Sequence, residues 1–151
     1  MEHATTVLIA DSSEDFCAGL QAALQRTDGF QVVGTANDGE QAIRMITDRK
    51  PEVLVLDLML SKQDGISVLK AISGMDRRPV TLATSAFLTE YVSSAAATLG
   101  VRYLMLKPCD MTALVERLEE ILGGESLRQR SPQQKQVVLE ALAVDDRPLP
   151  C

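Results

Sequence analysis

The chain has 151 residues and a formal net charge of −6, a length that suits one domain with a short extension and allows a full hydrophobic core. The negative charge argues against a nucleic-acid-binding surface, which needs clustered Lys and Arg to contact phosphates. A single His, and three Cys without metal-ligand spacing, argue against a zinc site. Without a signal peptide or a long apolar span, the sequence predicts a cytoplasmic protein with free thiols that does not contact a membrane.

Strand-like and helix-like segments alternate along the chain. Short apolar runs indicate strands, and apolar residues that recur every three or four positions indicate helices. In chain order the predicted elements are strand 7–10, helix 13–26, strand 30–36, helix 39–48, strand 53–57, a helix through 68–72, strand 79–84, helix 88–99, strand 101–106 and helix 111–122. Five strands alternating with five helices predict βαβ crossovers, and hence an α/β fold with a doubly wound parallel sheet.

The composition changes near the end of the last predicted helix. Residues 124–151 are predicted to be a linker or tail, with a short amphipathic helix over 133–144. This segment lacks the length, the positive charge and the helix-turn-helix pattern of a DNA-binding domain. We therefore expect one domain over 6–123 and no output domain in this chain.

Polar residues lie where four of the predicted strands end. Asp11 follows the first strand and Asp57 ends the third, Thr84 and Ser85 come at the end of the fourth, and Lys107 follows the fifth. An isolated Asp in such a position would more often cap the following helix. Binding sites of doubly wound sheets, however, lie at the carboxyl ends of the strands. The four positions together therefore predict a functional site at one edge of the sheet.

The segments around these positions resemble the receiver domain of bacterial two-component response regulators over residues 6 to about 122. The segments are LIADSSED, VLVLDLMLSKQDG, TSAF and YLMLKPCDM. VLVLD, TSAF and LGVRYLMLKPCDM are most similar to the branch of the sporulation master regulator, stage 0 sporulation protein A. The resemblance implies a flavodoxin-like five-stranded sheet with strand order 2-1-3-4-5. It also implies a signalling domain and not an enzyme, beyond self-catalysed phosphorylation and dephosphorylation.

The resemblance assigns the central role to Asp57. Its carboxylate would accept a phosphoryl group from a phosphohistidine on a histidine kinase or a histidine phosphotransfer protein. Phosphoryl transfer asks mainly for positioning and charge neutralisation, which Mg²⁺ and Lys107 would provide. Asp11, Asp57 and the backbone carbonyl of Met59 are the implied metal ligands, because Mg²⁺ prefers oxygen ligands and keeps several waters. The bond before Pro108 is expected to be cis.

A hydroxyl after the fourth strand is expected to bind the phosphate and reshape the surface beyond it. The family spacing to Lys107 favours Ser85, and Thr84 is the alternative if the strand is counted from Pro79. Met59 and Phe87 flank the acceptor in the family alignment. Because both are bulky and apolar, we expect them to obstruct in-line water and to give a long-lived phosphoryl-aspartate.

Several positions depart from the family pattern, and two of them bear on the mechanism. Ser12 stands where most receivers carry a second acid that contacts the metal, so Mg²⁺ binding is expected to be weak. Glu14 and Asp15 either compensate through water or cap the first helix, and capping is favoured because acids are stabilising at a helix N-terminus. Leu104 replaces the usual aromatic switch residue, and Tyr103 beside it is expected on the opposite face of the sheet.

The leading hypothesis is a phosphoacceptor domain of a phosphorelay, which in a full-length protein would switch an output, with sporulation-type transcription the expected one. The alternative, based on Ser12 and Leu104, is a pseudo-receiver that binds proteins without being phosphorylated. An aspartate-nucleophile phosphohydrolase is disfavoured, because it needs an acid two residues after the nucleophile, where this chain has Met59. Dimerisation on phosphorylation is a further prediction, and we expect no direct nucleic-acid contact.

Overall fold

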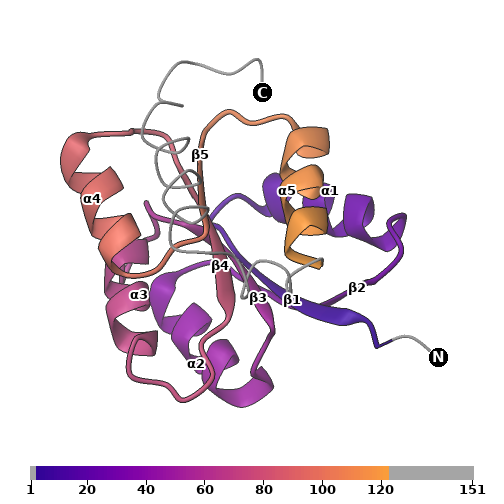
Figure 1. Ribbon diagram of the computed structural model, residues 1–151, viewed down its shortest axis with the longest axis horizontal. Helices are drawn as coiled ribbons and strands as arrows, with labels where there is room; N and C mark the ends of the chain where they lie inside the picture. Colours follow the sequence, from indigo (N-terminus) through magenta and orange to yellow (C-terminus); the bar gives the residue numbers. More distant parts are fainter. Residues whose placement is uncertain (1–2, 123–151) are drawn as a thin grey trace.

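The computed structural model describes residues 3–122 as a five-stranded parallel sheet in the order β2-β1-β3-β4-β5, with helices on both faces (Figure 1). This arrangement confirms the predicted flavodoxin-like α/β fold. The strands are β1 (Thr5–Ala10), β2 (Phe30–Ala36), β3 (Val53–Asp57), β4 (Val80–Ser85) and β5 (Tyr103–Leu106). The helices are α1 (Glu14–Gln25), α2 (Gly39–Arg49), α3 (Gly65–Ile72), α4 (Glu90–Thr98) and α5 (Met111–Leu122).

The sheet separates two hydrophobic clusters, because successive strand side chains point to opposite faces. Helices α1 and α5 cover one face, and α2, α3 and α4 cover the other (Figure 1). Tyr103 belongs to the cluster beneath α1 and α5, while Leu104 belongs to the cluster on the other face. The predicted displacement of Tyr103 from the face of Leu104 is therefore confirmed.

The predicted boundaries of α4 and β5 were too wide. Helix α4 begins only at Glu90, because the Thr89 side chain caps it by accepting a hydrogen bond from the Val92 N–H at 3.1 Å. Val101 was assigned to the strand, but its N–H donates to the Ala96 carbonyl at 3.0 Å and so satisfies the end of the helix. Strand β5 consequently has only four residues.

Strand β4 lies one residue later than predicted, over 80–85 instead of 79–84. Pro79 has no N–H to donate, and the Val80 N–H makes the first bond, to the Glu52 carbonyl at 2.9 Å. Within residues 3–122 no helix is both long enough and apolar enough to cross a bilayer. The helix predicted over 133–144 and the rest of the tail lie outside the described residues.

Candidate functional site

The carboxyl ends of β1, β3 and β5 bring two carboxylates and one ammonium together. Asp57 ends β3, and Asp11 and Lys107 directly follow β1 and β5. The Lys107 Nζ lies 2.5 Å from the Asp11 Oδ2 and 3.6 Å from the Asp57 Oδ2. The side chains of Asp11, Asp57 and Lys107 are 1%, 7% and 21% exposed, respectively. The predicted acidic and basic residues therefore meet in one largely buried cluster.

Backbone N–H groups orient both carboxylates. The Asp11 Oδ1 accepts from the Ser13 N–H at 2.8 Å, and the Asp57 Oδ1 accepts from the Met59 N–H at 2.9 Å. In each case the other carboxylate oxygen, Oδ2, is the one closer to Lys107. The loops after β1 and β3 thus hold the two acids in matching orientations toward a shared cation.

Burial and charge act against each other at these groups. Burial has the largest influence on Asp57 and raises the pKa of its carboxyl above the ordinary value, against the opposing effects of the Met59 N–H and of Lys107. Burial alone would lower the pKa of Lys107, but the hydrogen bond to Asp11 and the charge of Asp57 leave it above its ordinary value. Lys107 therefore remains an ammonium at neutral pH and neutralises part of the charge of the two acids.

Lys107 is held from several sides. Its Nζ lies 4.6 Å from the centroid of the Phe16 ring on α1, within the range of a cation–π interaction. Its backbone N–H donates to the Ser85 carbonyl at 2.8 Å, and its peptide bond to Pro108 is cis. The ammonium is thus fixed between α1 and the ends of β1 and β3.

The two candidate hydroxyls lie in different environments. Thr84 is paired with Asp57 in the β3–β4 register, so both side chains face α1 and α5, and its hydroxyl is fully buried without a hydrogen-bond partner in the described part of the chain. Ser85, on the opposite face, donates to the Phe87 carbonyl at 2.6 Å and accepts from the Phe87 N–H at 3.2 Å. Neither hydroxyl bonds to Asp57 or Lys107 in this state of the molecule.

Replacing Thr84 by Val should leave the free energy of unfolding unchanged or raise it by about 1 kcal/mol, because Val keeps the shape and removes a buried hydroxyl that has no partner. Urea denaturation of the wild type and the variant measures this difference in the free energy of unfolding. Ser85→Ala, which deletes both hydrogen bonds to Phe87, should instead cost about 1 kcal/mol. A loss of stability in Thr84→Val as large as in Ser85→Ala would show that the Thr84 hydroxyl does have a partner.

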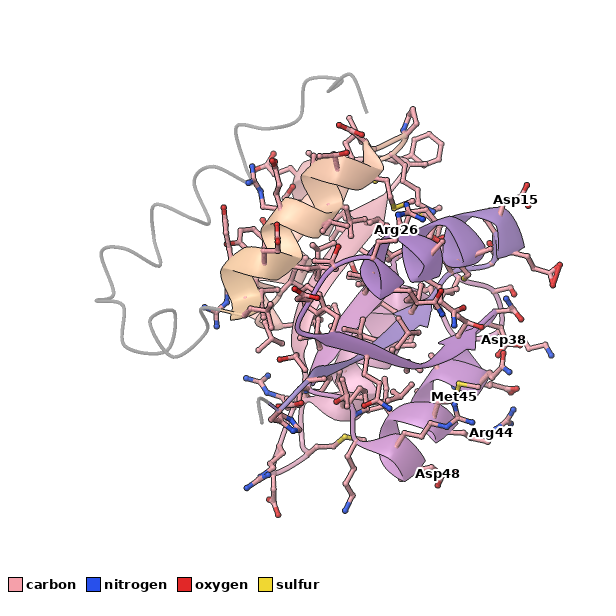
Figure 2. All side chains as sticks on the ribbon, turned by 90° about the vertical axis from the view of Figure 1, so that its right-hand side faces the viewer. Asp15, Arg26, Asp38, Arg44, Met45 and Asp48 are labelled. Atoms are coloured by element: carbon pink, nitrogen blue, oxygen red, sulfur yellow. The ribbon has the colours of Figure 1, made fainter. Side chains whose placement is uncertain are left out.

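The remaining predicted residues surround this cluster. Met59 is 53% and Phe87 64% exposed, so both present apolar surface next to the acceptor loop and the Ser85 turn. Ser12 is exposed and directly follows Asp11. Helix α1 is capped by Ser13, with Glu14 and Asp15 exposed in its first turn, and Figure 2 shows Asp15 at this end of the helix and Arg26 at the other. The capping interpretation of these acids agrees with this placement.

The donor set fits a hard cation that keeps most of its water. Asp11 and Asp57 supply two carboxylates, and the Met59 carbonyl belongs to the same loop as Asp57, which suits the few protein ligands that Mg²⁺ takes. Among residues 3–122 no group of three or more acidic, His or Cys side chains is arranged as a metal site. The Lys107 ammonium already bridges the two acids, so a bound cation would have to share them with it.

Sequence reasoning did not foresee the packing partners of the site. The helical spacing of Phe16 predicts only that it faces the core, and carries no signal that its ring lies over Lys107. Gly65 begins α3, and a Cβ there would come within 2.8 Å of the Asp57 carbonyl oxygen and 2.5 Å of the Leu58 Cα. The Asp64-Gly65 pair, a turn signal, could have indicated this close approach.

Cys17 on α1 lies close to the site but takes no part in its chemistry. The pKa of its thiol is raised to about 11, mainly by burial, so the thiol is unreactive.

Residues 7–119 match the family model of the response regulator receiver domain. The chain belongs to this family. A match over this range covers most of β1, all of β2, β3, β4 and β5, and most of α5. It explains why two acids, a lysine and a hydroxyl lie at neighbouring strand ends, and it makes the domain a signalling domain of two-component response regulators.

Several solved structures resemble this domain. The signal receiver domain of NarL from Mycobacterium tuberculosis is 26% identical, with a TM-score of 0.75, and the alignment covers 82% of this chain and 99% of that one. CheY in the CheX–CheY–BeF3–Mg complex from Borrelia burgdorferi is also 26% identical, with coverages of 78% and 89% and a TM-score of 0.69. An N-terminal domain from Wolinella succinogenes is 26% identical, with coverages of 83% and 99% and a TM-score of 0.74.

Proposed function

We propose that the domain accepts a phosphoryl group on Asp57 from a phosphohistidine of a histidine kinase or a phosphotransfer protein. The observation that carries the proposal is the cluster at the strand ends, in which the Asp57 Oδ2 faces Lys107 beside Asp11. A carboxylate oxygen of Asp57 forms the new P–O bond while the P–N bond to the imidazole breaks, and the imidazole keeps the electron pair. Lys107 neutralises charge on the transferred group, and Mg²⁺, when bound through Asp11 and Asp57, adds to this neutralisation.

Ser85 is the residue whose hydroxyl we propose to bind a phosphate oxygen once Asp57 is phosphorylated. Its hydroxyl now serves Phe87, donating to the carbonyl and accepting from the N–H. A hydroxyl that turns to a phosphate oxygen gives up its bond to the Phe87 carbonyl and so frees the turn between β4 and α4. Phe87 is 64% exposed, which means that this rearrangement changes an apolar part of the surface.

Incubation with a small phosphodonor such as acetyl phosphate and millimolar Mg²⁺, followed by intact-protein mass spectrometry, tests the proposal. We expect the gain of one phosphoryl group in the wild type and none in Asp57→Asn, which keeps the shape of the acceptor and removes its nucleophilic charge. If the wild type gained no phosphoryl group while its far-UV circular dichroism spectrum showed an intact fold, the pseudo-receiver alternative would be supported instead. A gain that persists in Asp57→Asn would place the acceptor elsewhere.

The phosphoryl-aspartate should be long-lived, because Met59 and Phe87 place bulky apolar side chains next to the acceptor. Met59→Ala should shorten the lifetime about threefold to tenfold, equivalent to roughly 1 kcal/mol of the hydrolysis barrier. Phosphate release from pre-phosphorylated protein measures it. Leu122→Ala is the control, since Leu122 is also an exposed apolar residue but lies at the far end of α5. A wild-type lifetime of seconds would contradict the proposed shielding.

Several finer assignments rest on the sequence. The sporulation branch is supported by the TSAF and LKPCDM segments, and transcription is the output we propose for a full-length protein of that branch. The CheY neighbour was solved with BeF3, Mg and the protein CheX, which supports a role for Mg²⁺ and for a protein partner here. A cytoplasmic location, self-catalysed phosphorylation and dephosphorylation, and dimerisation on phosphorylation belong to the same proposal.

A further inference from the structure

The loop that follows Asp57 rests against the start of α2. The first N–H groups of a helix have no acceptor within the helix, and the N–H of Gly39, the first residue of α2, donates instead to the Ser61 carbonyl at 3.0 Å. Beside this bond the Lys62 Nζ lies 3.6 Å from the Oδ2 of Asp38, which is labelled in Figure 2. Residues 38–39 therefore contact the loop between β3 and α3 directly.

This contact is possible only because Gly39 has no side chain. A Cβ there would lie 1.7 Å from the Gln63 carbonyl oxygen and 2.5 Å from the Gln63 carbonyl carbon, whereas real Cβ atoms essentially never come within 3.0 Å of such atoms. The obstacle is backbone and not the end of a flexible side chain. Any side chain at position 39 would therefore push the loop and the helix apart.

The part of the loop that touches α2 is a tight turn. Lys62 has a φ of +68°, in the left-handed region that residues other than glycine rarely adopt. The Ser61 carbonyl accepts a second bond here, from the Gln63 N–H at 2.8 Å. A strained backbone of this kind persists where the surrounding structure holds it, and the bond from Gly39 is such a constraint.

The near end of the same loop is fixed to the sheet. The Leu58 N–H donates to the Thr84 carbonyl at 2.8 Å. Met59 lies between this anchor and the one at Ser61, and its N–H donates to the Asp57 Oδ1 at 2.9 Å. A displacement of the turn at 61–63 is therefore transmitted to the residue that orients the acceptor carboxylate.

The segment before Gly39 contacts the second acid of the site. The Asp11 N–H donates to the Ala36 carbonyl at 2.9 Å, and the Asn37 Nδ2 donates to the Asp11 carbonyl in a longer bond of 3.4 Å. Residues 36–39 thus contact the loop of Asp11 at one end and the loop after Asp57 at the other.

We infer that Gly39 is a positioning residue of the phosphoacceptor site. Its missing side chain lets residues 36–39 fix the loop after Asp57 relative to Asp11. This inference rests on the proposed function, because in-line phosphoryl transfer depends on the placement of the acceptor and of the groups that neutralise charge. Gly39 itself lies outside the cluster of Asp11, Asp57 and Lys107 and acts through the two loops.

Gly39→Ala tests the inference with the smallest side chain. We expect phosphorylation by acetyl phosphate at millimolar Mg²⁺ to slow about tenfold to hundredfold per folded molecule, because a misplacement of about 1 Å can have an effect of this size. Urea denaturation gives the folded fraction. Gly74→Ala is the matched control, since Gly74 is an exposed glycine after α3 where a Cβ would meet nothing within 4 Å, and its rate should equal that of the wild type. Equal rates per folded molecule in both variants would show that Gly39 only stabilises the fold.

Hydrogen exchange followed by NMR separates this inference from the phosphorylation proposal, because it needs no phosphodonor. The Met59 amide should exchange about tenfold faster in Gly39→Ala than in the wild type, while the amide of Val55 in the middle of β3 should keep its rate. Unchanged exchange at Met59 would refute the positioning role alone, and a wild type that takes no phosphoryl group would refute the proposed function alone.

A measurement on the wild type decides the case in which Gly39→Ala does not fold. The Gly39 amide should then exchange at least about tenfold more slowly than an amide without a hydrogen bond, as the Leu58 amide also should, because both donate to backbone carbonyls. Fast exchange at Gly39 beside slow exchange at Leu58 would show that α2 does not hold the loop.

Discussion

Replacing Ser12 by Asp should tighten Mg²⁺ binding by about tenfold or more. The described site offers two buried carboxylates, and the ammonium of Lys107 already lies 2.5 Å from one of them and 3.6 Å from the other. The affinity of oxygen-ligand sites for divalent cations follows the number and charge of their ligands, and Mg²⁺ dehydrates reluctantly for neutral ones. An acid at position 12 would restore a net charge of −2 to the cluster where it is now −1. Tenfold corresponds to about 1.4 kcal/mol.

Ser12→Asn is the matched control for this substitution, because Asn has the shape of Asp and an oxygen donor but no charge. We expect its Mg²⁺ affinity to stay within about twofold of the wild type. Isothermal titration calorimetry on the unphosphorylated protein measures the affinity directly, without any phosphorylation step. If Ser12→Asp bound Mg²⁺ no more tightly than Ser12→Asn, position 12 would not face the cation, and Lys107 alone would limit its binding.

The main features of the fold could be predicted from the sequence because apolar periodicity reports which faces are buried. The run over 53–56 is apolar on both faces, and the structure buries it together with Asp57. Boundaries were less accurate where a single hydrogen bond decides them. The cap by Thr89 sets where α4 begins, and the bond from the Val101 N–H to α4 delays the start of β5. Nothing in the residue types of Thr89 and Val101 distinguishes these positions from the neighbouring ones.

The residues of the site were predictable, but their pairing was not. Asp11, Asp57 and Lys107 stand at strand ends, which a parallel sheet must bring to one edge. That Lys107 would lie closer to Asp11 than to Asp57 depends on the loop hydrogen bonds and on the Phe16 ring, which are tertiary contacts without a local signal. The same holds for the Ser85 hydroxyl and its bonds to Phe87.

Lys107→Met should destabilise the metal-free protein by about 2–3 kcal/mol. Met keeps much of the length of the side chain but removes the ammonium, which leaves the Asp11 and Asp57 carboxylates, 1% and 7% exposed, without a counter-ion. Removing one partner of a fully buried ion pair costs about 3–5 kcal/mol, and the 21% exposure of Lys107 argues for less than the full amount. Urea denaturation in the presence of EDTA measures the difference.

Lys62→Met is the matched control. Lys62 pairs with Asp38 at 3.6 Å, but its side chain is 63% exposed, and surface pairs contribute about 0–1 kcal/mol. Figure 2 shows Asp38 at the start of α2, at the surface of the molecule. If both Lys→Met substitutions had the same effect on stability, the lysine at the strand end would be no more than a surface charge, and its proposed role in neutralising the site would fail.

The loss of stability caused by Lys107→Met should depend on pH, because it depends on whether Asp57 is ionised. Burial raises the folded-state pKa of Asp57 above its unfolded value, so this carboxyl favours folding most when protonated, and its contribution to stability is lost as the pH rises through the folded pKa. Without the ammonium of Lys107, which opposes this shift, the folded pKa of Asp57 rises further. The penalty should therefore be largest at neutral pH and shrink as the pH falls below that pKa, where a protonated Asp57 needs no counter-ion. A penalty that is constant across this range would mean that Lys107 stabilises the domain by packing and not by its charge.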